Sequence, residues 1–220
     1  MDTFGIRWSI QKLTYSKAYK NADSPNDLWN DQHVKWRIIK EKPKDQSIED
    51  FVLEMESMKT QSTEDIRLRI QFVINDRYLE QMIKYASYQG KFDLFFQGYF
   101  QVFEFVESYR KYDWGLFLCE KLLGLPNTPQ NIEWLRWDYA SDKPFPAKAQ
   151  DVQLYCCGAC GWDRLCGSWD VNVFCDQNFI FWKWSYEKEW SIPSFQFDKH
   201  QYESAFVEYQ AYLHKKLRQS

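Results

Sequence analysis

Residues 151–185, DVQLYCCGACGWDRLCGSWDVNVFCDQNFIFWKWS, decide the fold of this chain. A glycine-rich stretch around four of the six cysteines and the polar triplet Asp176-Gln177-Asn178 divide the segment into three runs. Short runs of β-branched and aromatic residues between such turn-forming residues are typical of β-strands. The pattern predicts a three-stranded meander with strands at about 151–157, 168–175 and 179–185.

The residues after the meander predict a terminal helix. Asp198 and Gln201 have the spacing of a capping box, and Phe197 and Tyr202 have the spacing of a hydrophobic staple. One helical face then carries the apolar side chains Ala205, Phe206, Tyr209, Leu213 and Leu217.

The first half of the chain contains both the alternating pattern of strands and the three- and four-residue spacing of helices. Apolar residues alternate with polar ones in two runs of the first forty residues, and a further alternating run ends at Asn75-Asp76. These runs predict an antiparallel strand pair with a turn at 21–27, and then a strand from Ile66. Helical spacing predicts helices at about 48–58, capped by Ser47 with Asp50, from Leu79 to Ala86, at 98–109, and at 114–123 between Asp113 and Gly124. A short strand is expected at 134–139.

Together these elements predict an α+β protein. An antiparallel sheet with a C-terminal meander packs against several helices, which include the C-terminal one. A chain of 220 residues is long enough to bury a sizeable core without staples, so we expect a single domain over 1–220.

Composition excludes some classes of function. The chain has 28 basic and 31 acidic residues, mixed along its length, whereas a nucleic-acid site needs clustered Lys and Arg. Aromatic residues make up 19% of the sequence, with 11 Trp, and such residues anchor both cores and interfaces. We therefore expect no nucleic-acid partner and a core rich in rings, with some rings at the surface.

Neither an apolar run long enough to span a bilayer nor a basic and apolar leader at the N-terminus is visible in the sequence. The expectation is a cytoplasmic protein without a membrane partner. Thiols stay reduced in that compartment, so the six cysteines do not predict three disulfides.

The cysteines leave a zinc site as an alternative. Cys157 and Cys160 have the two-residue gap of a zinc knuckle, and Cys166 is a further candidate ligand. Structural zinc sites usually need a second pair, and Cys175 and His200 are not paired at that spacing. The first expectation is therefore a protein without a metal or cofactor, and the alternative is a small zinc-binding domain.

Catalytic motifs are not visible either. The three histidines, His33, His200 and His214, are thinly spread, and the sequence holds no nucleophile elbow, zinc-protease helix or phosphate-binding glycine loop. The sequence predicts a non-enzymatic protein. A hydrolase without a recognisable motif stays open as an alternative.

Several short segments, in this order, resemble a family of small bacterial cytosolic proteins of unassigned function. They are Ile70 to Leu79, the cysteine turn Cys157 to Gly167, Ile180 to Trp184, and Pro193 to Asp198 followed by Gln201, Tyr202 and Ala205. The family pattern has a strand ending in Asn-Gly-Arg, a Cys-Gly hairpin, a Trp strand and a Phe-x-Phe-Asp helix start. The resemblance covers 66–213, leaves 1–60 outside, and implies a compact α+β domain without assignable catalytic residues.

This chain departs from that pattern in two places. Asp76 stands where the pattern has glycine, and the interval between Cys160 and Cys166 is longer than in the family turn. Both departures weaken the case for a fixed metal site.

As a class, acidic, aromatic-rich, single-domain bacterial proteins without a motif of chemistry also resemble the immunity proteins that neutralise a cognate toxin. Such a protein needs a rigid scaffold and aromatic anchors surrounded by charge. Two predicted loops place rings beside charged groups, and the alternative is that these rings fold back on the core. For a protein partner, with a cognate toxin as the candidate, the expected contact residues are Trp162, Asp163, Arg164, Tyr186, Glu187, Glu189 and Trp190.

Overall fold

A computed structural model covers residues 1–220 and describes 1–15, 34–88, 99–125, 137–138, 143–144, 151–157, 169–184 and 192–219. The packing divides into two compact units, one of Met1–Ile6 with Gln71–Ser220 and the other of Arg7–Ile70. The strands β1 (Phe4–Tyr15) and β3 (Ile66–Ile74) each continue from one unit into the other. The single domain expected from the sequence stays a prediction.

The Arg7–Ile70 unit contains the predicted strand pair and helix. β2 (Val34–Glu41) pairs antiparallel with β1, which confirms that prediction, and α1 (Ile48–Gln61) follows. Ser47 caps α1, because its Oγ accepts a hydrogen bond from the backbone N–H of Asp50 at 3.1 Å. The helix is longer than predicted and ends at Gln61, with Ser62 as its C-cap. Among the described residues of this unit, the buried apolar side chains are Trp8, Ile10, Ile48, Phe51, Met55 and Ile70.

The strand order of this first sheet is β2-β1-β3-β4, where β4 (Arg77–Tyr78) forms a hairpin with the end of β3. At the hairpin, Asn75 and Asp76 have positive φ angles of 51° and 61°. A two-residue turn with this backbone matches the right-handed twist of the flanking strands. The predicted strand end at Asn75-Asp76 is confirmed.

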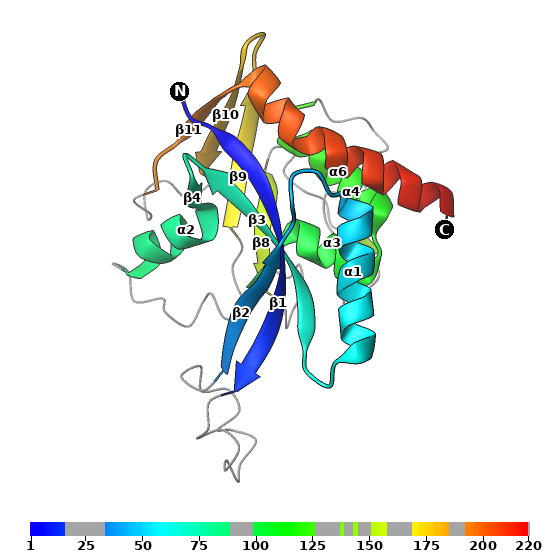
Figure 1. Cartoon of the computed structure of the whole chain (residues 1–220). Helices are drawn as coiled ribbons and strands as arrows, with labels where there is room; N and C mark the ends of the chain where they lie inside the picture. Colours follow the sequence, from blue (N-terminus) through cyan, green and yellow to red (C-terminus); the bar gives the residue numbers. More distant parts are fainter. Residues whose placement is uncertain are drawn as a thin grey trace. The chain divides into compact units, whose positions relative to one another are not determined.

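The larger unit holds a five-stranded antiparallel sheet of order β11-β10-β9-β8-β5 (Figure 1). Its middle strands β8 (Asp151–Cys157), β9 (Trp169–Cys175) and β10 (Phe179–Trp184) confirm the predicted meander. At the second reversal, Asp176 Oδ1 accepts from the backbone N–H groups of Asn178 and Phe179 at 2.8 and 2.7 Å. Asp side chains that accept hydrogen bonds from nearby backbone N–H groups favour tight turns. The sequence therefore predicted this reversal correctly.

The two outer strands of this sheet were not predicted. β11 (Phe195–Asp198) pairs with β10, and β5 (Tyr99–Gln101) pairs with β8. The helix predicted at 98–109 is therefore wrong at its start, since α3 begins only at Val102 and ends at Tyr109. Apolar residues are too dense here for periodicity to separate the two states.

Some other boundaries also differ. α4 (Tyr112–Leu122) begins after Lys111, so the prediction of Asp113 as its cap was wrong, whereas Gly124 ends it with a φ of 70° as predicted. The strand expected at 134–139 coincides in part with β6 (Trp137–Asp138), which pairs with β7 (Lys143–Pro144). α2 (Leu79–Tyr88) confirms the helix expected after the hairpin.

The C-terminal helix α6 (Lys199–Gln219) is confirmed and contacts α4, β10 and β11 (Figure 1). α4 comes close to its neighbours at Gly115. A Cβ atom there would lie 2.8 Å from Val106 Cγ1 and 3.2 Å from a Leu213 methyl carbon. A small residue at this position is what allows the close approach.

Aromatic rings form much of the core of the larger unit. The Phe4 ring centroid lies 4.5 Å from that of Tyr202 and 5.4 Å from that of Trp182. Trp182 Nε1 donates to the Tyr202 hydroxyl at 3.0 Å, so both polar atoms are satisfied in the interior. Further ring contacts join these residues to Phe72, Phe103, Phe197, Phe206 and Tyr209. The aromatic-rich composition thus serves the core.

Candidate functional site

The residues expected from the sequence to contact a partner lie outside the described part of the chain. They belong to 158–168 and 185–191, and they are Trp162, Asp163, Arg164, Tyr186, Glu187, Glu189 and Trp190. Their role stays a prediction.

The zinc alternative also depends on residues outside the described part of the chain, so it stays a prediction. Cys160 and Cys166 fall in 158–168, and only the backbone of Cys157, at the end of β8, is described. Within the described ranges Cys119 is buried, Cys175 is exposed, and His, Cys, Asp and Glu side chains form no group of three or more that could hold a metal ion. Burial raises the pKa of the Cys119 thiol far above its usual range, so this group stays protonated.

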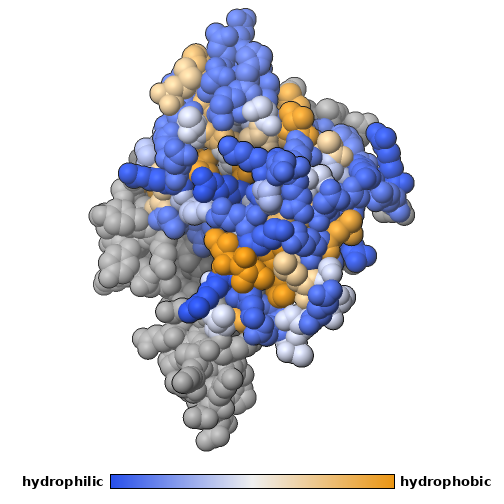
Figure 2. All heavy atoms as spheres, in the orientation of Figure 1, coloured by the Kyte–Doolittle hydropathy of each residue, from blue (hydrophilic) through white to orange (hydrophobic). Residues whose placement is uncertain are grey.

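Among the described residues, two adjacent aliphatic side chains on β2 are exposed. Ile38 and Ile39 are each 45% exposed, although large aliphatic side chains are usually buried. Figure 2 shows apolar side chains at the surface over β2, surrounded by hydrophilic ones. We call Arg37, Ile38 and Ile39 the β2 edge.

A β-bulge explains how two consecutive isoleucines are both exposed. Ile10 pairs with Lys40 and Gln11 pairs with Ile38, which leaves Ile39 as an extra residue without a partner on β1. In a regular strand, neighbouring side chains point to opposite faces, and a bulge interrupts that alternation. The second alternating run of the first forty residues, Val34, Trp36 and Ile38, predicts a half-buried strand face, and that prediction is wrong at Ile38.

A fixed cation lies on the same sheet. The Arg67 guanidinium carbon is 4.0 Å from the centroid of the Trp36 ring. Arg67 Nε and Nη2 both donate to Gln11 Oε1, at 3.2 and 3.0 Å. Stacking and two hydrogen bonds hold this positive charge and its aromatic neighbour in one geometry.

A second set of contacts holds the β2 backbone in place. Lys40 Nζ donates to both carboxylate oxygens of Glu54 on α1, at 2.5 and 2.6 Å, and Gln46 Nε2 donates to one of them at 3.1 Å. The hydrogen bond from Lys40, then that from Gln46, lowers the pKa of Glu54. The charge of Lys40 is thus used within the Arg7–Ile70 unit, and this contact anchors β2 beside the bulge.

The larger unit has a different cluster of chemical interest. Glu107 on α3 accepts hydrogen bonds from the hydroxyls of Tyr209 and Tyr212 on α6, at 3.1 and 2.8 Å. Burial raises the pKa of Glu107 to about 7, against the hydrogen bonds and the charge of Lys216, which lower it. A carboxyl group with a pKa near 7 can hold or release a proton at physiological pH. Both of its oxygens are engaged by tyrosines, which fits a structural tie between the two helices.

Sequence reasoning missed the β2 edge because it assumed regular alternation. The available signal was the pair of adjacent isoleucines inside a basic run. Two consecutive aliphatic residues in an alternating strand indicate either a fully buried strand or a bulge.

Comparison with known proteins gives no relatives: no family model, curated protein or solved structure matches this chain significantly. The resemblance to a bacterial family is therefore still a prediction. Among the described helices, none is both long and apolar enough to cross a membrane.

Proposed function

We propose that the protein is a non-enzymatic binding module of the immunity type, which neutralises a cognate bacterial toxin by direct contact. The observation that carries the proposal is the β2 edge, where Ile38 and Ile39 are exposed on an anchored strand. Exposed apolar side chains framed by polar ones are typical of protein-interaction sites. The surface requires no chemistry from its residues, only a fixed shape.

One observation favours the alternative of a hydrolase. The pKa of Glu107 is raised to about 7 by burial, as it is in many catalytic acids. Structural networks raise pKa values too, and the two tyrosine hydroxyls are placed on both carboxylate oxygens of Glu107. We therefore assign Glu107 to the support of α6 and keep the binding function as the proposal.

The test is co-expression with the product of a toxin gene located beside the gene of this protein. We expect the two proteins to co-purify and the growth of toxin-producing cells to be restored. Ile38→Ser should weaken the complex about tenfold, because burial of an isoleucine side chain is worth about 1.5–3 kcal/mol. The matched control is Val207→Ser on α6, which removes an aliphatic side chain that is 63% exposed.

Two results would count against the proposal. One is the lack of any toxic neighbour together with no toxin captured from the native host. The other is equal loss of binding in Ile38→Ser and Val207→Ser, since that would remove the β2 edge from the contact. Metal analysis of the purified protein tests the zinc alternative separately, because a structural zinc would be found at about one equivalent.

A further inference from the structure

Resting on the proposed function, we infer that β2 accepts an extended acidic segment of the partner as an added strand along its outer edge. β2 is the first strand in the order β2-β1-β3-β4, so β1 is its one neighbour among the described strands. An edge strand presents a row of N–H and C=O groups that can pair with another chain. Strand addition uses these groups for affinity and the flanking side chains for specificity.

The side chains of β2 supply the apolar part of such a contact. Ile38 and Ile39 are exposed to the same extent, 45% each, and Ile39 is the extra residue at the register shift. Aliphatic residues on alternate positions of an added strand could cover them. Burying these two side chains under a partner strand would contribute to the binding free energy, which explains why two isoleucines lie at the surface.

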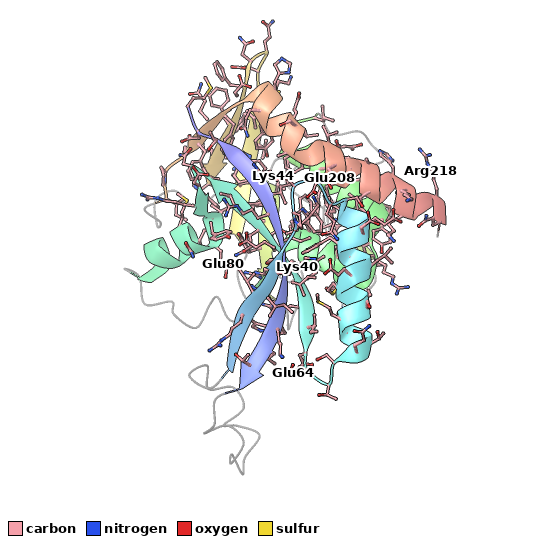
Figure 3. All side chains as sticks on the ribbon, in the orientation of Figure 1. Lys40, Lys44, Glu64, Glu80, Glu208 and Arg218 are labelled. Carbon is pink, nitrogen blue, oxygen red and sulfur yellow. The ribbon has the colours of Figure 1, made fainter. Side chains whose placement is uncertain are left out.

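The charge of β2 and its flanks selects the partner. Residues 35–45 contain five basic and two acidic side chains, although the whole chain carries a net charge of −3. Lys40 is paired with Glu54, while Arg37 and Lys44 are exposed and Arg67 is fixed over Trp36. Figure 3 shows Lys40 and Lys44. A segment rich in Asp and Glu fits this excess of positive charge.

The same features disfavour a second copy of this chain as the occupant. Lysines and bulges on an edge are common devices against self-pairing, because two identical edges would bring like charges together. Prevention of self-pairing does not explain the exposed isoleucines, because an edge strand that served only to prevent pairing would have polar residues at positions 38 and 39. Protection from self-pairing and selection of an acidic strand are therefore compatible on β2.

The experiment uses the full chain and a synthetic nine-residue peptide that alternates Glu with Val. Binding is measured by fluorescence anisotropy at low and moderate salt, and the contact is mapped by amide hydrogen exchange. We expect binding that weakens with salt and slowed exchange at residues 35–41. A peptide of the same length that alternates Lys with Val should not bind. N-methylation of alternate peptide amides should reduce affinity at least tenfold, because it removes the donors of strand pairing.

Charge reversal supplies the matched variants. Arg37→Glu should weaken peptide binding about tenfold, since like charges would face each other across the added strand. Arg218→Glu changes the net charge equally at an exposed position near the end of α6 and should leave binding unchanged. The inference is overturned if the acidic peptide does not bind, if N-methylation has no effect, or if both variants weaken binding alike. Concentration-dependent dimers with protected β2 amides would also overturn it, because they would assign the edge to a second copy.

Failure of the inference can be told from failure of the proposed function. If Ile38→Ser abolishes toxin neutralisation but neither the acidic peptide nor the acidic segments of the toxin slow exchange on β2, the binding function stands and strand addition is wrong. If the peptide binds β2 and no toxin is neutralised, the surface is a peptide site of another function.

Discussion

The side-chain amide of Gln201 closes two hydrogen bonds with the backbone of Phe4, 197 residues earlier in the chain. Gln201 Oε1 accepts from Phe4 N at 3.1 Å, and Gln201 Nε2 donates to Phe4 O at 2.6 Å. The first turn of α6 thereby holds the start of β1. Phe4 also inserts its ring among Tyr202, Phe206 and Trp182, so the pair fixes the N-terminus onto the aromatic core.

Gln201→Ala should destabilise the protein by about 2–3 kcal/mol, because it leaves two partly buried backbone groups of Phe4 without their partner. Chemical unfolding followed by Trp fluorescence measures the change. Gln201→Glu should also destabilise, since one carboxylate oxygen would face Phe4 O. Gln219→Ala, at the last residue of α6, serves as the control and should cost little. An equal effect of the two alanine variants would show that the Phe4 contact contributes nothing.

Gln201 also shows where sequence reasoning ends. The spacing of Asp198 and Gln201 predicts a capping box, and Asp198 Oδ1 does accept from Gln201 N at 2.9 Å. The expected staple is present as well, with Phe197 and Tyr202 ring centroids 5.1 Å apart. The Gln201 side chain, however, binds Phe4, because a distant strand supplies a donor and an acceptor together. The spacing of residues in the sequence predicts hydrogen bonds between near neighbours, but not the contact between Gln201 and Phe4.

The same division explains the rest of the fold. The strands of the meander and the helix ends at Ser47, Gly124 and Asp198 are set by turn and cap residues a few positions apart, so they could be read from the sequence. β5 is only three residues long and exists through its pairing with Cys157, Cys156 and Tyr155 of β8. The bulge at Ile39 depends likewise on the register against β1. Pairing between distant segments, and therefore the β2 edge, could not be predicted.

The Asn75-Asp76 turn predicts opposite effects for two glycine substitutions. Asp76 has a φ of 61°, which glycine adopts without steric cost. Asp76→Gly should therefore raise the free energy of unfolding by about 0.5–1 kcal/mol. Thermal unfolding at neutral pH measures the shift in Tm.

Asn75→Gly should lower stability, although its φ of 51° also suits glycine. Asn75 Oδ1 accepts from Thr3 N at 2.9 Å, and Asn75 Nδ2 donates to Asp2 Oδ1 at 2.7 Å. Loss of these bonds should cost about 1–2 kcal/mol. A gain in stability with both substitutions would show that backbone strain outweighs the ties of Asn75 to the N-terminus.

Gly124 predicts a large effect of a single methyl group. Its φ is 70°, and a Cβ atom would lie 2.7 Å from the Cβ atom of Cys175. Gly124→Ala should cost about 2 kcal/mol or more, because backbone strain and a clash add. Gly5→Ala is the matched control, since nothing lies within 4 Å of a Cβ atom built there. Similar melting temperatures for the two variants would contradict the close approach of the α4 end to β9.

Glu107 predicts a pH dependence of stability with a defined sign. Burial raises the pKa of its carboxyl group from 4.5 to about 7 in the folded protein. The folded state therefore keeps a proton that the unfolded chain has already lost between these values. The stability that this proton provides is complete below pH 4.5 and is lost as the pH rises through 7.

The measurement is urea unfolding of the wild type and Glu107→Gln at pH 5 and pH 8. The wild type should lose on the order of 2–3 kcal/mol relative to the variant over this interval, since one pKa unit corresponds to about 1.4 kcal/mol. Glutamine cannot titrate, yet it keeps an oxygen that can accept from Tyr209 or Tyr212. Glu203→Gln, which removes a carboxylate that is 39% exposed on α6, should follow the wild type at both pH values. If the wild type and Glu107→Gln respond equally to pH, Glu107 is ionised in the folded protein and the two tyrosine hydroxyls outweigh its burial.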